Sequence, residues 1–193
     1  MINFALTNIL SMERIKLHDK EFRIFIPYSK IEEAIKEVAA QLNKDYKDKE
    51  MPIFLSVLNG SFMFSADLLK NIDFQCEISF IKLSSYSGTS TTGEIREVLG
   101  ITTSVEGRDV VVLEDIVDTG NTVEELDRIL REQGARSVKI CTLLLKPEAY
   151  HKSLPIDYVA LEIPSDFIVG YGLDYDELGR QYKDIYVLDI PKN

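Results

Sequence analysis

Apolar and polar residues follow two different periods along this chain. Four apolar runs stand out, at residues 53–58, 78–83, 110–113 and 138–145. Three of these runs lack an alternation of apolar and polar residues, which is typical of parallel strands that helices cover on both faces. The runs therefore predict buried strands of one sheet.

Between the runs, apolar residues recur three or four positions apart, which predicts amphipathic helices. The two clearest sets are Ile31, Ala34, Ile35, Val38 and Leu42, and Val123, Leu126, Ile129 and Leu130. The second helix is expected to end at Gly134, a favourable residue for a helix C-terminus. Strands that alternate with such helices predict an α/β fold with a doubly wound, mainly parallel sheet, which binds ligands at the carboxyl ends of its strands.

Two regions break this pattern. Residues 84–100 are polar and rich in Ser, Thr and Gly, and we expect either a mobile lid or a hairpin flap there. The last part of the chain suggests short strands and turns. We therefore expect a single domain of residues 1–193, with a core of about residues 30–150 and a small hood formed by the N-terminal segment and about residues 155–193.

Composition narrows the possible partners. The formal net charge of -10 disfavours nucleic acid, because Lys and Arg must neutralise its phosphates. Cys76 and Cys141 lie in apolar runs without metal-binding spacing and are interpreted as buried thiols. With only two histidines, a zinc site of His and Cys is disfavoured, so any metal is expected to have oxygen ligands.

The sequence also bears on location. No apolar segment approaches the length of a membrane span, and the N-terminus lacks the pattern of a signal peptide. We therefore expect a cytoplasmic protein without a membrane partner. Met12 offers an alternative start, in which case residues 1–11 are an extension.

Residues 110–122, VVVLEDIVDTGNT, carry the strongest chemical signal. An apolar run ends in Glu114 and Asp115, and Asp118 precedes a short polar turn at residues 119–122. Carboxylates can accept hydrogen bonds from sugar hydroxyls, and the free amides at a helix start can donate to a phosphate. The segment therefore predicts a site for a ribose 5-phosphate. The alternative is an acidic strand end followed by a Thr helix cap.

This string resembles the PRPP-binding motif of the type I phosphoribosyltransferases: an apolar run, two acids, two mostly apolar residues, a variable residue, Thr-Gly, one further residue, and Ser or Thr. The resemblance continues, in the expected order, through residues 55–69, 84–95, 143–150 and 162–180. It implies the fold of that family and a purine salvage enzyme. Such an enzyme would transfer the 5-phosphoribosyl group from PRPP to N9 of hypoxanthine or guanine, giving IMP or GMP and pyrophosphate.

By this resemblance, Glu114 and Asp115 bind the ribose hydroxyls. The 5-phosphate site consists of Asp118, Thr119, Gly120, Asn121 and Thr122. Asp118 is also the expected catalytic residue, since 6-oxopurine enzymes carry Asp there to address purine N7, whereas enzymes for other bases usually carry Thr or Ala. The alternative for Asp118 is a helix cap.

Three further residues match the purine site of the family. Lys146 would donate to the exocyclic O6, Phe167 would stack on the base, and the backbone of Ile168 would bind its edge. The alternatives are a solvated lysine at a strand end and an aromatic residue in the core of the hood. A donor aimed at position 6 disfavours adenine, whose amino group there is also a donor.

Pyrophosphate and metal sites follow from the same resemblance. Leu58, Asn59, Gly60 and Arg180 match the residues that bind pyrophosphate, with a cis peptide bond expected before Asn59. Asp174 matches the aspartate that binds Mg²⁺. The alternatives are a plain strand-to-helix turn at residues 58–61 and a turn-forming Asp at position 174.

The resemblance also implies a flexible loop with Ser85 and Tyr86, which closes over PRPP, and a homodimer or homotetramer. Asn59 and Asn121 stand where many relatives carry a basic residue, which leaves the affinity for PRPP open.

Two other functions remain open from the sequence. One is a regulator that senses PRPP or nucleotides on the same fold without catalysis. The other is transfer to a different base, above all xanthine, because the group at purine position 2 is expected to be contacted by backbone atoms.

Overall fold

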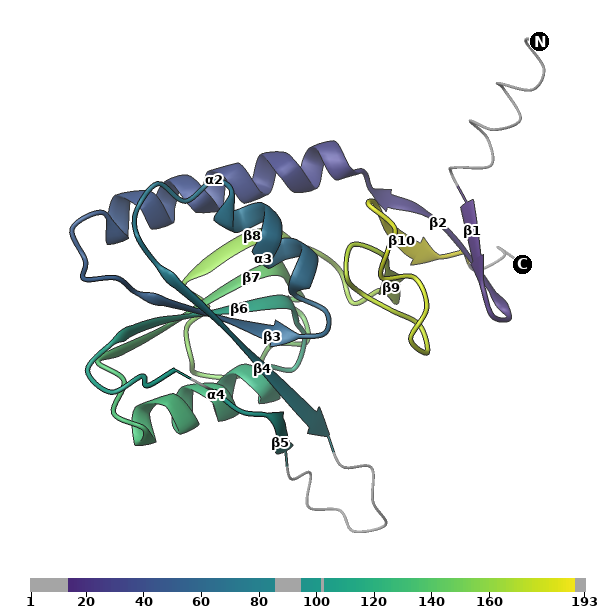
Figure 1. The fold of residues 1–193 in the computed structure, drawn as a ribbon. Helices are drawn as coiled ribbons and strands as arrows, with labels where there is room; N and C mark the ends of the chain where they lie inside the picture. Colours follow the sequence, from purple (N-terminus) through teal and green to yellow (C-terminus); the bar gives the residue numbers. More distant parts are fainter. Residues whose placement is uncertain (1–13, 86–94, 102, 190–193) are drawn as a thin grey trace.

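The computed structural model describes residues 14–85, 95–101 and 103–189, which form two sheets (Figure 1). The larger sheet contains β3 (Ile53–Leu58), β4 (Glu77–Ser85), β5 (Ile95–Leu99), β6 (Asp109–Val117), β7 (Ser137–Leu145) and β8 (Tyr158–Glu162). Its strand order is β5-β4-β3-β6-β7-β8, and β5 is antiparallel to β4 while the other neighbours are parallel. The four apolar runs of the sequence all lie in strands of this sheet.

Helices cover both faces of the larger sheet. Figure 1 shows α2 (Tyr28–Tyr46) and α3 (Phe62–Leu69) on one face and α4 (Asn121–Glu132) on the other. In β6, Val111 and Leu113 pack into the core under α2 and α3, whereas Val110 and Val112 pack into the core under α4. Because both faces are buried, β6 carries an unbroken apolar run. The predicted doubly wound α/β fold is confirmed.

The predicted helical faces are also confirmed. The five apolar positions expected on α2 are all buried, as are three of the four expected on α4. Gly134 follows the C-cap of α4 with a φ of 83°, the left-handed conformation that favours glycine there.

The strand order creates a crevice at one end of the sheet. From β3 the chain passes through α3 to β4 on one side, and the later strands β6, β7 and β8 lie on the other side. Their loops therefore diverge between the carboxyl ends of β3 and β6. Such a switch point is where open α/β sheets bind ligands.

The second sheet is the hood, made by both terminal segments. It joins β1 (Arg14–Leu17), β2 (Lys20–Ile26), β10 (Ile185–Leu188) and β9 (Ile168–Val169) in that order, with antiparallel pairing. Its small core contains Leu17, Phe22, Val169 and Tyr186. The expected start of the hood near residue 155 is too early, because β8 pairs with β7 in the larger sheet. β8 is an edge strand of mixed burial, and its short apolar run at residues 158–161 does not by itself show which of the two sheets it joins.

One hydroxyl group and one backbone amide attach the hood to the helices. The hydroxyl of Tyr171 donates to Asp67 of α3 at 2.7 Å, and the hydroxyl of Tyr28, at the start of α2, donates to the same carboxylate at 3.1 Å. The amide of Tyr28 donates to Asp184 at 2.7 Å. These bonds hold the hood beside the carboxyl ends of the strands.

The polar segment after β4 returns along the same sheet edge. Lys82 and Ser85 of β4 pair with Leu99 and Ile95 of β5, so the two described strands agree with a hairpin flap. Tyr86 lies outside the described residues, as do the other residues up to 94. Among the described helices, none is long and apolar enough to cross a membrane.

Candidate active site

The crevice at the switch point has a volume of about 190 Å³. Residues from three predicted groups line it together: Leu58 and Gly60 of the pyrophosphate loop, Glu114 and Asp115 of the sugar site, and Thr122 of the phosphate turn. These residues come from the end of β3 and the loop after it, from β6 and from the start of α4, which are adjacent only in the folded chain. The crevice thus combines carboxylate acceptors with backbone donors.

Glu114 is buried and Asp115 is half-buried, and neither carboxylate contacts a cation in the described residues. Burial raises the pKa of the Glu114 carboxyl well above its usual range, and the charge of Asp115 raises it further. Burial also raises the pKa of Asp115 to about 6, against a hydrogen bond of 3.0 Å from the amide of Ile116. Within the described residues, neither acid forms an ion pair. Perturbed, unpaired acids in a crevice are typical of functional sites.

Gly60 and Asp115 are in direct contact across the crevice. A Cβ atom at Gly60 would lie 1.6 Å from the Asp115 carboxylate, so only glycine fits between the loop and the acid. A Cβ atom at Gly172 of the hood would lie 2.0 Å from the carbonyl oxygen of Gly60. The hood therefore packs directly against the loop after β3.

The loop after β3 has the expected unusual backbone and an unexpected support. The peptide bond between Leu58 and Asn59 is cis, which confirms that prediction. Beneath the loop, the hydroxyls of Ser56, Ser61 and Ser65 are buried and joined by two hydrogen bonds of 2.8 Å. Ser61 also donates to the carbonyl of Val57 at 2.6 Å, which bridges the two ends of the loop. The apolar pattern did not predict this cluster, although the polar Ser56 inside an apolar strand was a signal for it.

The phosphate turn leads directly into α4. Gly120 is the N-cap, with a φ of 81°, and no side chain caps the helix. A Cβ atom there would lie 2.3 Å from the ring of Tyr150, a packing residue to which no role had been assigned. The alternatives in which a Thr or Asp118 caps α4 are therefore wrong. Helix geometry leaves the first amides, from Asn121 onwards, without partners inside the helix.

Asp118 and Lys146 form an ion pair of 2.9 Å. They follow the adjacent parallel strands β6 and β7, and the amide of Lys146 donates to the carbonyl of Val117. The Lys146 side chain is only 12% exposed, so the alternative of a solvated lysine is wrong. Asp118 is 48% exposed and open to a ligand. The fold thus places a proton acceptor beside a cationic donor.

Phe167 and Ile168 lie in the hood and have different environments. Phe167 is 45% exposed, and its described ring contacts are with Phe22 and Tyr175 of the hood. Its partial exposure leaves ring surface free for stacking, as expected for a purine site. Ile168 is buried in β9 and joins the core under α2.

Arg180 and Asp174 are joined in the hood. Their side chains form an ion pair of 2.7 Å, and Arg180 also donates to the carbonyl of Gly172 at 2.8 Å. Asp174 accepts a hydrogen bond from the amide of Glu177, so it also forms the turn that was its alternative role. The buried Nε atom of Arg180 has no partner among the described residues. Through Gly172, this pair is connected to the loop at Gly60.

This fold and crevice define a class of enzyme that binds phosphorylated sugars. Residues 27–176 match the phosphoribosyl transferase domain, and the chain belongs to this family. The assignment made from the sequence motif is thus confirmed.

Individual relatives carry a more specific name. The hypoxanthine-guanine phosphoribosyltransferase of Bacillus subtilis is 41% identical over 89% of this chain and 94% of its own length. The enzyme of the same name from Streptococcus agalactiae is 45% identical over 79% of this chain and 85% of its own length. Among solved structures, a hypoxanthine phosphoribosyltransferase from Staphylococcus aureus matches with a TM-score of 0.82 and 35% identity, covering 94% of this chain and 95% of the other.

Proposed function

We propose that this protein transfers the 5-phosphoribosyl group from PRPP to N9 of hypoxanthine or guanine, giving IMP or GMP and pyrophosphate. The observation that carries the proposal is the ion pair between Asp118 and Lys146 beside the start of α4. The Lys146 ammonium donates to the purine O6, while Asp118 faces N7. The amino group of adenine would instead oppose a donor with a donor, so adenine is disfavoured.

PRPP occupies the crevice between β3 and β6. Glu114 and Asp115 accept hydrogen bonds from the ribose hydroxyls, which compensates for the burial of both acids. The 5-phosphate binds at the start of α4 through the amides of residues 119–122 and the hydroxyls of Thr119 and Thr122. Asn121 adds no positive charge, so the phosphate affinity rests on these donors and on the helix dipole.

The chemical step exchanges one bond at C1′ for another. Purine N9 forms a bond to C1′ while the bond from C1′ to the pyrophosphate oxygen breaks, and pyrophosphate leaves with that electron pair. Asp118 accepts the proton from N7 as the base loses it. General-base catalysis of this kind contributes about 10² to 10⁴ in rate. Phe167 stacks on the base, and the backbone of Ile168 binds its edge.

Pyrophosphate is held by the backbone of the loop after β3 and by a hood residue. Leu58, Asn59 and Gly60 provide the loop, and Arg180 provides a guanidinium. Ser85 ends β4, and with Tyr86 it belongs to the flap that closes over PRPP and excludes water.

Asp174, beside Arg180, offers a carboxylate oxygen of the kind that Mg²⁺ binds, but the protein alone does not supply a complete set of metal ligands. The described residues contain no cluster of three or more His, Cys, Asp or Glu side chains that could hold a metal. Asp174 would therefore supply one carboxylate to Mg²⁺, and oxygens of PRPP and water would supply the other ligands. When bound, the ion would screen the charge of pyrophosphate.

The test is an assay with PRPP, Mg²⁺ and each of hypoxanthine, guanine, xanthine and adenine, followed by nucleotide formation. We expect turnover with hypoxanthine or guanine and little with adenine. Absence of turnover with every 6-oxopurine would contradict the proposed reaction. Strong turnover with adenine would contradict the roles of Lys146 and Asp118.

A further inference from the structure

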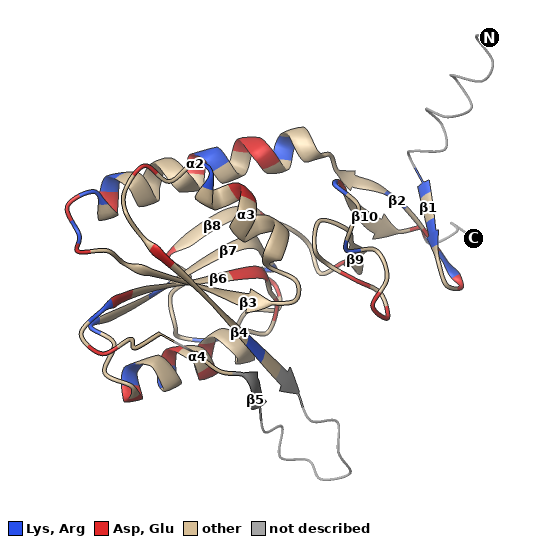
Figure 2. Cartoon of the chain, viewed as in Figure 1, with Lys and Arg blue, Asp and Glu red and all other residues tan. Residues whose placement is uncertain are grey.

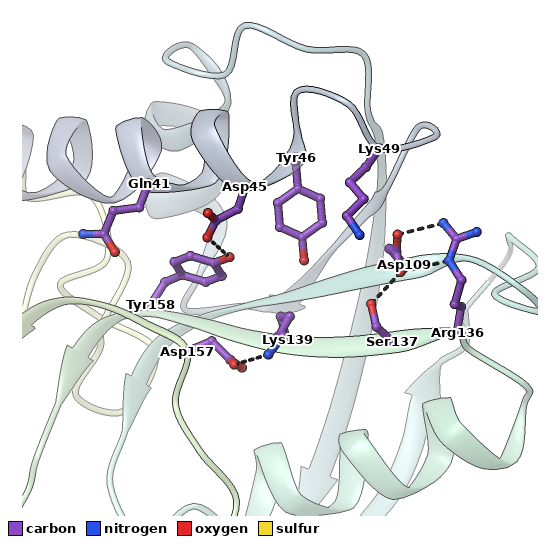
Figure 3. A pocket seen from close by; sticks show the side chains of 10 residues that line it. All are labelled: Gln41, Asp45, Tyr46, Lys49, Asp109, Arg136, Ser137, Lys139, Asp157 and Tyr158. Carbon is purple, nitrogen blue, oxygen red and sulfur yellow. Dashed lines mark hydrogen bonds and ion pairs between the residues drawn. The ribbon is translucent and has the colours of Figure 1, made fainter.

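A second pocket lies at the end of the larger sheet opposite the crevice, where the amino ends of β6, β7 and β8 lie beneath the end of α2 (Figure 3). We call it the amino-edge pocket. Its volume of about 590 Å³ falls within the range of small-molecule sites. Roughly twenty water molecules occupy this volume in liquid water, so the pocket can hold a ligand larger than a single phosphate or carboxylate group.

The carboxylates of the amino-edge pocket are already engaged. The three pairs are Asp109 with Arg136, Asp157 with Lys139, and Asp45 with the hydroxyl of Tyr158. Asp109 is buried and accepts from both Nε and Nη2 of Arg136, at 3.1 and 2.7 Å. Because each acid has a protein donor, the pocket offers little to a bare cation.

Two donors in the same pocket have no such partner. Tyr46 is only 4% exposed, yet its hydroxyl points into the pocket (Figure 3) and forms no hydrogen bond with the described residues. The Lys49 ammonium points into the same space and forms no ion pair with them. Burial raises the pKa of the Tyr46 phenol, so it remains a protonated donor at neutral pH.

An ammonium and a phenol directed at one space (Figure 3) are donors suited to an oxyanion. We propose that the amino-edge pocket binds a small organic anion, whose carboxylate or phosphate group is held by Lys49 and Tyr46. The remaining volume, beside the ring of Tyr158, holds the organic part of the ligand.

This site is separate from the active site. Asp109 begins β6 and Val117 ends it, so the strand places about 25 Å between the two edges of the sheet. A ligand in the amino-edge pocket therefore does not compete with PRPP for space. Its binding is also independent of whether the chain transfers a phosphoribosyl group.

The test is a titration of the full chain with citrate, GMP and inorganic phosphate, followed by the amide NMR shifts of Ser137 and Asp157. The amide of Thr122 reports separately on the active site. Citrate represents carboxylates, GMP an organic phosphate and inorganic phosphate the free ion, so the probe that binds identifies the chemistry. We expect at least one probe to give saturable shifts at Ser137 and Asp157, with a Kd below about 1 mM.

Three variants then test the donors. Lys49→Ala should weaken the binding about tenfold, the value of a charged hydrogen bond, and Tyr46→Phe about fivefold. Lys47→Ala is the matched control, because Lys47 is an exposed lysine two positions away whose only described ion pair is with Asp48. It should leave the affinity unchanged.

Three results would overturn the proposal. One is the absence of saturable shifts at Ser137 and Asp157 with all three probes. A second is shifts confined to Thr122, which would assign all binding to the active site. The third is an equal loss of affinity in Lys49→Ala and Lys47→Ala, which would show a general effect of charge.

Discussion

The two ends of β6 carry acids in opposite states. At the amino end, the hydrogen bonds from Arg136 hold the pKa of Asp109 below its usual range, and Ser137 donates a further bond. At the carboxyl end, burial raises the pKa values of Glu114 and Asp115. Figure 2 shows the acidic colour at this end of β6, beside the uncharged strand β3.

This difference separates structure from function within one strand. A buried carboxylate with a cation and hydrogen bonds is compatible with a stable fold, whereas one without a cation costs free energy. Proteins retain such a costly carboxylate at sites where a bound ligand supplies the missing hydrogen-bond donors. Acids at the amino end should therefore control stability, and acids at the carboxyl end should control binding and catalysis.

The largest expected effect is on catalysis at the carboxyl end. Asp118→Asn removes the proton acceptor and should lower kcat about 10²-fold or more. The dissociation constant of PRPP should change far less, because the amides of residues 119–122 remain. Steady-state kinetics and calorimetric PRPP binding measure the two effects. Asp48→Asn, at an exposed position, is the control and should leave kcat unchanged. An equal loss of kcat and PRPP affinity in Asp118→Asn would contradict the general-base role.

The next effect is on stability at the amino end. Asp109→Asn removes a charged acceptor from Arg136 and should lower the free energy of unfolding by about 2 kcal/mol, with kcat retained. The folded pKa of Asp109 is lowered, so its stabilisation is present above the unfolded value near 3.8 and is lost as the pH falls through the folded pKa. Urea unfolding of Asp109→Asn at pH 7 measures the loss. A variant as stable as the parent would show that the pair does not stabilise the fold.

At the carboxyl end of β6, the free energy of unfolding should depend on pH with the opposite sign. The folded pKa of Asp115 is raised from 3.8 to about 6, so the folded chain binds the extra proton in this window. Stability without ligand should therefore fall as the pH rises from 4 to 6, by on the order of 1 kcal/mol. PRPP binding should strengthen over the same range, because ionised acceptors bind hydroxyls better.

Asp115→Asn should flatten both pH profiles, since the amide does not titrate. Unfolding and PRPP titrations between pH 4 and 7 measure them. Profiles that keep their steps in the variant would assign the titration to another group.

The smallest expected effect concerns the loop after β3, which lines the crevice. Ser61→Ala removes the bond from the Ser61 hydroxyl to the carbonyl of Val57 and should raise the KM of PRPP about fivefold, with the KM of hypoxanthine unchanged. Ser65→Ala is the control, because it leaves both hydrogen bonds of the Ser61 hydroxyl in place. Equal effects of both variants would show general loosening of the buried cluster.

Sequence patterns were most informative where neighbouring residues act together. The pattern of burial in the apolar runs and the helical faces follows directly from strand and helix geometry. The turn at residues 119–122 is likewise formed by residues that are neighbours in the sequence. The same reasoning failed for β8, because the short apolar run at residues 158–161 does not show which sheet the strand joins. It also missed the cluster of Ser56, Ser61 and Ser65, because nothing in the spacing of serines shows which of them face each other.

The order of residues along the chain was sufficient to predict the α/β fold, its helical faces and the acids of β6. Apart from the family resemblance, which placed Asp118 and Lys146 at one purine, it did not show which partners those acids would have. Parallel pairing of β6 with β7 brings Lys146 to Asp118, and the same pairing brings Arg136 to Asp109. These contacts span 28 and 27 residues, a separation at which spacing carries no signal. Strand register and packing of the hood therefore decide which carboxylates are neutralised and which remain for a ligand.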